Sequence, residues 1–158
     1  MVVALLNYCV MPGINAMISK LEAVSIADIV GIAMENTQKR LTDSQRNQLL
    51  EGLRSDGTKI GKYKSKTYAA KKFAMNPLAG LGNIDNRLTG AFQSDIIVDI
   101  RPESASLVFS SVDEKTSMLV SLQGKNIFGL STPFAQEYSK YFLKPEVVKL
   151  IKQRINGV

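Results

Sequence analysis

The stretch SDIIVDIRPESASLVFSSV, residues 94–112, predicts the fold class because two alternating runs flank a short turn. Its first run places Ile96, Val98 and Ile100 at every second position. This period of two puts apolar side chains on one face of a β-strand. Residues 102–104 can form the turn, and the run that follows can return as an antiparallel partner through Leu107 and Phe109. The sequence therefore predicts a β-hairpin with one apolar face.

Helical spacing of apolar residues precedes the hairpin. Residues 14–40 carry this pattern, with a break near residues 23–25. Thr42, with Gln45 three positions later, matches a capping box and predicts the start of a second helix. Beyond a turn at residues 54–58, residues 67–75 predict a further short helix.

Helical signals also follow the hairpin. Residues 113–124 predict a short helix that ends at Gly124. Thr132 then predicts an N-cap, with Pro133 as the first helical residue, and Pro145 predicts the start of a last helix. The apolar stripe of this last helix favours a place in the core over a subunit contact. We therefore expect an α+β fold, a small antiparallel β-sheet (a hairpin) flanked by N-terminal and C-terminal helices.

The length of 158 residues fits a single domain. Within it we expect an N-terminal helical region (1–53), a basic arm or loop (54–83), and the sheet with the C-terminal helices (84–158). Residues 1–11 are apolar but have neither the preceding basic residues nor the following cleavage site of a signal peptide. Cys9, the only cysteine, can form no internal disulfide and is expected to be a small buried side chain.

The positive charge is concentrated in the middle of the chain. The net charge is +6, and residues 53–91 hold eight Lys or Arg against two Asp. The densest part is RSDGTKIGKYKSKTYAAKK, residues 54–72. A basic patch therefore describes the chain better than a uniformly basic protein does.

Two interpretations of this basic segment stay open. In an extended conformation, Lys62, Lys64 and Lys66 would lie on one side, and Tyr63 and Tyr68 could stack on nucleic-acid bases. Alternatively, the segment is a loop in which lysine serves only for solvation. The candidate interaction residues are Lys59, Lys62, Tyr63, Lys64, Lys66, Tyr68, Lys71 and Lys72.

Residues typical of catalytic sites are scarce. The chain has no histidine, one cysteine and scattered carboxylates, which disfavours general-base, triad and zinc chemistry. Residues 57–62, GTKIGK, resemble a phosphate loop but are one residue short, and Tyr63 occupies the position of the magnesium-binding Ser or Thr. We expect no enzymatic activity and no catalytic residue, cofactor or metal site.

The order of four segments resembles a family of small tailed-phage proteins of the virion-morphogenesis and tail-completion type, which join head to tail. The segments are QLLEGLRSDGTKIGKYKSKTYAAKK, NIDNRLTGAFQSDIIVDI, SSVDEKTSMLVSLQGKNIFGLS and YFLKPEVVKLIKQRI, within residues 48–155. The resemblance implies a structural protein that forms a homo-oligomeric ring at the neck or tail of a virion assembled in the host cytoplasm. Expected partners are portal, neck or tail proteins, with non-specific contact to packaged DNA and no membrane.

The resemblance also implies roles for residues. Leu88, Thr89, Gly90 and Phe92 would fix the chain as it enters the sheet, with Gly90 allowing close backbone approach and Leu88 and Phe92 in the core. The basic segment would be an arm that reaches a neighbouring subunit, an acidic portal surface or DNA. The rival function is a nucleic-acid-binding accessory protein that uses residues 59–72.

Overall fold

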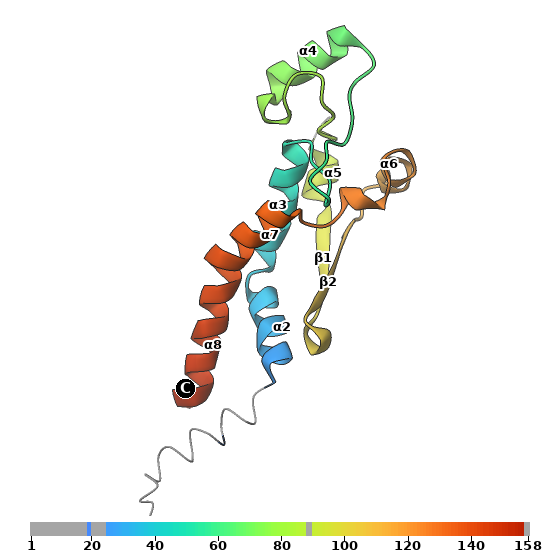
Figure 1. Ribbon diagram of the computed structural model, residues 1–158. Coiled ribbons are helices and arrows are strands. Elements are labelled where there is room, and N and C mark those ends of the chain that lie inside the picture. Colours follow the sequence, from blue (N-terminus) through green and yellow to red (C-terminus); the bar gives the residue numbers. More distant parts are fainter. Residues whose placement is uncertain (1–18, 20–24, 88–89, 157–158) are drawn as a thin grey trace, which may run out of the picture.

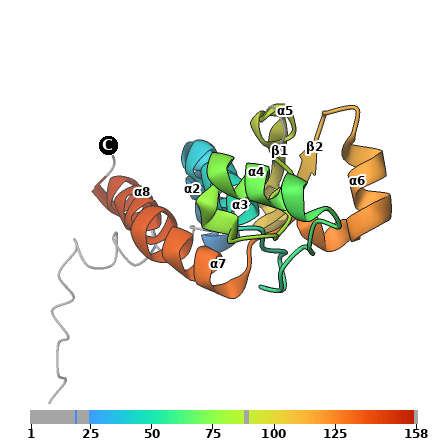
Figure 2. The same ribbon diagram turned by 90° about the horizontal axis from the view of Figure 1, so that it is seen from above.

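The computed structural model describes Ser19, residues 25–87 and residues 90–156, and within them it has the predicted α+β architecture (Figure 1). In chain order the elements are α2 (Ile26–Asn36), α3 (Gln38–Leu50), α4 (Lys66–Met75), α5 (Ala91–Ser94), β1 (Ile96–Arg101), β2 (Ser106–Ser111), α6 (Thr116–Gln123), α7 (Thr132–Tyr138) and α8 (Lys144–Asn156). Figure 2 shows α2 and α8 on one side of the hairpin and α6 on the other. No helix in these described ranges is long and apolar enough to cross a membrane.

The hairpin is confirmed. β1 and β2 pair antiparallel, with Val98 opposite Phe109, and a 3-10 turn, η2 (Pro102–Ser104), joins them. Ile96, Val98 and Phe109 are buried, whereas the alternate positions of β1, Ile97 and Asp99, are exposed. The alternation in sequence therefore places one apolar face against the helices.

Helix α3 is the element around which the core is built. Leu41 and Leu49 on its inner face are almost completely buried. Outside the core, the Arg46 side chain donates hydrogen bonds to the Gln93 and Ser94 carbonyl oxygens, at 2.6 and 2.8 Å. The buried apolar cluster is Leu41, Leu49, Ile60, Phe92, Ile96, Val98, Phe109, Ile127 and Tyr138.

The start of α3 differs from the prediction. The helix begins at Gln38 after Thr37, so Thr42 lies inside it and does not form a capping box with Gln45. The Thr42 hydroxyl instead donates to the Lys39 carbonyl oxygen at 2.9 Å, a local bond that threonine can make within a helix. Of the predicted break near residues 23–25, only Ser25 lies among the described residues; it is the N-cap of α2, and its hydroxyl accepts a hydrogen bond from the Asp28 N–H.

Two glutamines of α3 bind an extended segment that follows α6. Gln45 donates to the Ile127 carbonyl and accepts from the Gly129 N–H, at 3.1 and 2.7 Å. Gln48 donates to the Gly129 carbonyl and accepts from the Ser131 N–H, at 2.8 and 2.6 Å. Both glutamines are fully buried. Their amides therefore pair with backbone groups as a neighbouring strand would, and we call this set of bonds the glutamine ladder.

The C-terminal helices form one rod beside α2 and α3 (Figure 1). Ser131, not Thr132, is the N-cap of α7. The last helix, α8, begins at Lys144, one residue before the predicted Pro145, and continues directly from the preceding turn. Between them lies a π-turn, η4 (Ser139–Leu143), in which the Lys144 N–H bonds the Ser139 carbonyl. No α8 residue is fully buried and Val148 is 41% exposed, so the prediction that α8 is a core helix is wrong.

Helix α2 approaches the hairpin tip very closely at Gly31. A Cβ on Gly31 would overlap the Cα of Pro102 and lie 2.7 Å from its carbonyl oxygen. These two atoms, the Cα and the carbonyl oxygen of Pro102, belong to the backbone of η2, so they cannot move aside as the end of a flexible side chain could. The absence of a side chain at residue 31 thus allows α2 and the hairpin to pack together.

Gly31→Ala is expected to lower the free energy of unfolding by about 1–3 kcal/mol through this overlap. The loss should exceed the gain of about 1 kcal/mol that alanine brings to a helix interior. Urea unfolding of the two proteins measures the difference. Glu35→Ala, at an exposed position of the same helix, is the control and should change stability by less than about 0.5 kcal/mol. A more stable Gly31→Ala variant would contradict the close approach.

Candidate interaction site

The basic segment is folded, and we refer to residues 59–83 as the basic knob. Isolated antiparallel bridges join Leu53 to Lys59 and Lys62 to Asn83 at its base. Ser65 caps α4, the predicted short helix, by accepting a hydrogen bond from the Tyr68 N–H at 3.3 Å. Figure 1 shows α4 at the opposite end of the molecule from the hairpin tip and the end of α8. The knob is thus an ordered projection, whereas the sequence predicted an arm or loop with one short helix.

A buried carboxylate, Asp85, holds the knob to the rest of the protein. Its Oδ1 accepts hydrogen bonds from Lys72 Nζ at 2.9 Å, from the Tyr63 hydroxyl at 3.0 Å and from the Arg87 N–H at 3.1 Å. Its Oδ2 accepts from Asn76 Nδ2 at 2.9 Å. Asp85 and Lys72 are 1% and 4% exposed. We call this set of groups the Asp85 cluster.

The surroundings of the Asp85 cluster shift the pKa values of Asp85 and Tyr63. Burial by itself would raise the pKa of Asp85, but the hydrogen bonds from Asn76 and Lys72 outweigh it and keep the pKa below its ordinary value. Burial and the bond to Asp85 raise the pKa of Tyr63. Tyr63 therefore stays a neutral hydrogen-bond donor at physiological pH, and the cluster is suited to structural support.

The predicted interaction residues divide into two groups. Lys72 and the Tyr63 hydroxyl belong to the Asp85 cluster. Lys72 is buried and unavailable to a partner, whereas the Tyr63 ring is half-buried. Lys59 donates to the Glu51 carbonyl at 2.6 Å, which ties the start of the knob to the end of α3. The exposed residues are Lys59, Lys62, Lys64, Lys66, Tyr68 and Lys71. Lys66 is the first residue of α4, so the strict extended alternation predicted for Lys62, Lys64 and Lys66 is not formed.

The knob also exposes large apolar side chains that the sequence analysis did not select. Phe73 is 40% exposed, Met75 52%, and Leu78 and Leu81 66% each. Phe73 and Met75 lie in α4, and Leu78 lies in the following turn, η1 (Pro77–Ala79). Several exposed apolar side chains in one part of a surface are typical of a protein–protein contact surface, and charged side chains belong at its rim.

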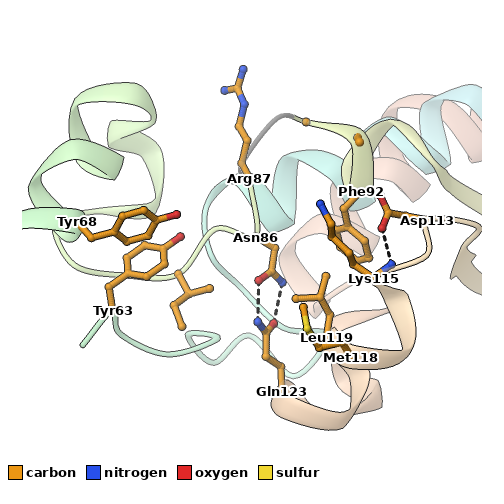
Figure 3. Close-up of a pocket in the computed structure, with 13 residues that line it drawn as sticks. Tyr63, Tyr68, Asn86, Arg87, Phe92, Asp113, Lys115, Met118, Leu119 and Gln123 are labelled. Carbon is orange, nitrogen blue, oxygen red and sulfur yellow. Dashed lines mark hydrogen bonds between the residues drawn. The ribbon is translucent and has the colours of Figure 1, made fainter. Parts of the chain in front are cut away.

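A cavity of about 270 Å³ lies between the knob and α6 (Figure 3). Tyr63 and Tyr68 form one wall, with ring centroids 5.0 Å apart in an edge-to-face arrangement. Phe92 and Leu119 form part of the opposite wall, and Arg87 extends outward from the rim. We call it the tyrosine pocket.

The tyrosine pocket is braced by a pair of amides. Asn86 Nδ2 donates to Gln123 Oε1, and Gln123 Nε2 donates back to Asn86 Oδ1, both at 2.7 Å (Figure 3). This reciprocal pair connects the chain after the knob to α6. The walls and rim of the pocket suit an apolar side chain next to an anionic group. Among the described residues, no group of three or more His, Cys, Asp or Glu side chains could hold a metal ion.

The predicted motif at the entrance to the sheet, Leu88, Thr89, Gly90 and Phe92, lies only partly within the described residues. Leu88 and Thr89 lie outside the described residues. Phe92 is 4% exposed and belongs to the core, as expected. Gly90 precedes α5 with a φ of 93°, and an added Cβ would meet no atom of the described residues within 4 Å. Gly90 is therefore required for its left-handed backbone and not for the close approach that the sequence analysis proposed.

Comparison with protein-family models, with curated proteins and with solved structures finds no match to this chain. Within its described part, the basic knob combines an ordered base, exposed lysines and exposed apolar side chains. The tyrosine pocket lies directly beside it.

Proposed function

We propose that this protein is a non-enzymatic structural component of a tailed-phage virion, and that it forms an oligomeric ring at the head-to-tail interface. The order of its sequence segments, with the resemblance that they carry, motivates this proposal. In each subunit, the basic knob would contact the neighbouring subunit or the adjoining portal, neck or tail protein. When each subunit binds its neighbour through two different surfaces, the contacts are heterologous, and they close into a ring if the rotation between subunits allows it.

The observation that carries the proposal is the composition of the knob surface. A loop that only solvates lysine would not need a buried carboxylate with four hydrogen-bond donors at its base. A surface that only grips phosphates would not need exposed Leu78 and Leu81. A protein interface uses both, because apolar side chains fill its centre and charges at its rim select the partner.

Copy number in particles tests the proposal directly. Quantitative mass spectrometry of gradient-purified phage particles should find this chain in a fixed, simple ratio to the portal protein. Its absence from particles would contradict the structural role.

The knob itself is tested by substitution. We expect Lys62→Ala, Lys64→Ala and Lys66→Ala together to reduce assembled infectious particles by about tenfold or more, because losing 1.4 kcal/mol of binding lowers affinity tenfold. The matched control removes the same charge from exposed α8 positions, Lys144, Lys152 and Arg154, and should assemble normally. Equal titres for both variants would show that the knob is not the contact.

Nucleic-acid binding is the second candidate, and the exposed lysines next to Tyr68 favour it. Neutralised phosphates would make such binding steeply salt-dependent, with a slope of about 0.7–0.9 per phosphate contacted. The ring proposal expects only weak, non-specific DNA binding. Sub-micromolar DNA binding near physiological salt, with a slope reduced in the triple knob variant, would favour the second candidate.

A further inference from the structure

The tyrosine pocket has two walls that come from different parts of the chain. Tyr63 and Tyr68, from the basic knob, form one side (Figure 3). The other side consists of Phe92 and, from α6, Met118 and Leu119. Tyr68 and Met118 are 40% and 54% exposed, so a ligand can reach both walls from solvent. Ligand sites usually measure about 300–1,000 Å³, so this cavity of about 270 Å³ has room for one ring system and not for a folded segment.

The tyrosine wall suits a flat aromatic ligand. Nucleobases stack on tyrosine rings, and such stacking tolerates any base because every base has a π-face. The Tyr63 hydroxyl is held by Asp85 at 3.0 Å, and the Tyr63 ring contacts the Tyr68 ring edge to face. The wall is therefore positioned before a ligand arrives, which lowers the entropy cost of binding.

The pair of amides adds hydrogen-bonding groups between the two walls. A primary amide has two N–H donors and an oxygen with two lone pairs. Asn86 and Gln123 each use one N–H and one lone pair on the other. Each residue thus keeps one donor and one acceptor position, and both residues line the pocket. A donor next to an acceptor is the pattern with which asparagine and glutamine recognise the edge of a base.

The cations of the pocket lie where an anionic group would be placed. Arg87 extends outward from the rim, Lys115 lines the same cavity, and both side chains are exposed. Within the part of the chain that the structure describes, neither cation has a hydrogen-bond or ion-pair partner. Asp113 is the one carboxylate of the described lining, and its Oδ1 already accepts a hydrogen bond from the Lys115 N–H at 2.7 Å. The remaining positive charge suits a phosphate.

A ligand that uses all of these groups has a flat ring, a hydrogen-bonding edge and an anionic group. An apolar side chain next to a carboxylate would use the walls and the rim but would leave the amides unused. We propose that the tyrosine pocket binds a nucleotide, with its base between the tyrosines and α6 and its phosphate at Arg87 and Lys115. Free nucleotides and single-stranded nucleic acid both contain this unit. The proposal uses none of the exposed knob lysines and does not rest on ring formation.

Isothermal titration calorimetry with the nucleoside monophosphates, and with short single-stranded oligonucleotides, tests the base site. We expect one nucleotide to bind per chain, and Tyr68→Ala to weaken binding about tenfold or more through lost stacking. Tyr68→Phe keeps the ring and should bind like the native protein. Tyr141→Ala removes an exposed tyrosine outside the pocket and is the matched control. Binding of free nucleotides supports a free ligand, and Tyr68-dependent binding of oligonucleotides alone supports a strand.

The phosphate site has its own variant, which also serves if Tyr68→Ala does not fold. Arg87→Gln should weaken nucleotide binding about tenfold and leave binding of the matching nucleoside unchanged, because the nucleoside has no phosphate. Arg101→Gln, exposed near the hairpin tip, removes the same charge outside the pocket and is the control.

Three results would overturn the proposal. The first is that no nucleotide or oligonucleotide binds at millimolar concentration. The second is that Tyr68→Ala and Arg87→Gln bind nucleotides as tightly as the native protein does. The third is that a dipeptide of aspartate and phenylalanine binds more tightly than every nucleotide, which would assign the pocket to a protein ligand.

Discussion

Asp85→Ala is expected to destabilise the basic knob more than any other single change described here, by about 3–5 kcal/mol. The substitution leaves the Lys72 ammonium buried without its counter-charge, and it removes the acceptor of the Tyr63 hydroxyl and the Asn76 amide. Urea unfolding measures the total loss. Amide hydrogen exchange in α4 shows whether the knob opens before the rest of the protein.

The sign of the pH dependence follows from the lowered pKa of Asp85. The stabilisation from its charged form is fully present above the unfolded pKa of about 3.9 and is lost as pH falls through the lower folded pKa. The difference in the free energy of unfolding between the native protein and Asp85→Ala should therefore be constant near neutral pH and become smaller in acid. A difference in the free energy of unfolding that becomes larger below pH 4 would contradict a lowered pKa of Asp85 in the folded protein.

A double variant controls for the loss of charge. Lys72→Met with Asp85→Asn removes both charges and keeps an acceptor at residue 85. Because an isolated buried charge is the main cost, the double variant should be much less destabilised than the sum of its two single variants. Additive losses would mean that Lys72 and Asp85 do not interact.

Gln48→Met is expected to lower the free energy of unfolding by about 2–4 kcal/mol. Methionine matches the shape of glutamine but leaves the Gly129 carbonyl and the Ser131 N–H without their partner, and each unsatisfied buried group costs about 1–3 kcal/mol. Thermal and urea unfolding measure the loss.

The neighbouring residue supplies the control for the glutamine ladder. Asn47 is exposed on the same helix, so Asn47→Met should change stability by less than about 0.5 kcal/mol. Gln45→Met and Gln48→Met together should cost less than their sum, because both glutamines bind the single residue Gly129. If Gln48→Met is as stable as Asn47→Met, the ladder contributes nothing.

The sequence predicted the hairpin well because successive side chains of a β-strand point to opposite faces, so apolar residues at every second position are the ones that become buried. Val98 and Phe109 are apolar in sequence and buried in space. The predicted start of the second helix was wrong because the Thr42–Gln45 pattern, although typical of an N-cap, lies inside α3. A local motif competes with tertiary contacts there, and Gln45 is used for a long-range bond to Ile127.

The candidate site was predicted only in outline. Charge density marked the basic segment, but it could not separate buried Lys72 from exposed Lys71, which is adjacent in sequence. That distinction depends on Asp85, thirteen residues away from Lys72, and on the helical phase of α4. The glutamine ladder left no periodic signal either, since its partner segment lies more than 80 residues further along the chain.

The π-turn between α7 and α8 bears on how this protein can diverge. A turn that closes on the fifth residue holds one residue more than an α-helical turn, which corresponds to about 100° of helical phase. Because the π-turn accommodates this residue within a single turn, losing one residue at 139–143 would restore an α-helical turn and leave the same face of α8 outward, with α7 still against α3. The loss of one residue elsewhere in the rod would instead rotate the helix that follows by about 100°, so the π-turn is a position where the chain can shorten without changing the surface that α8 presents.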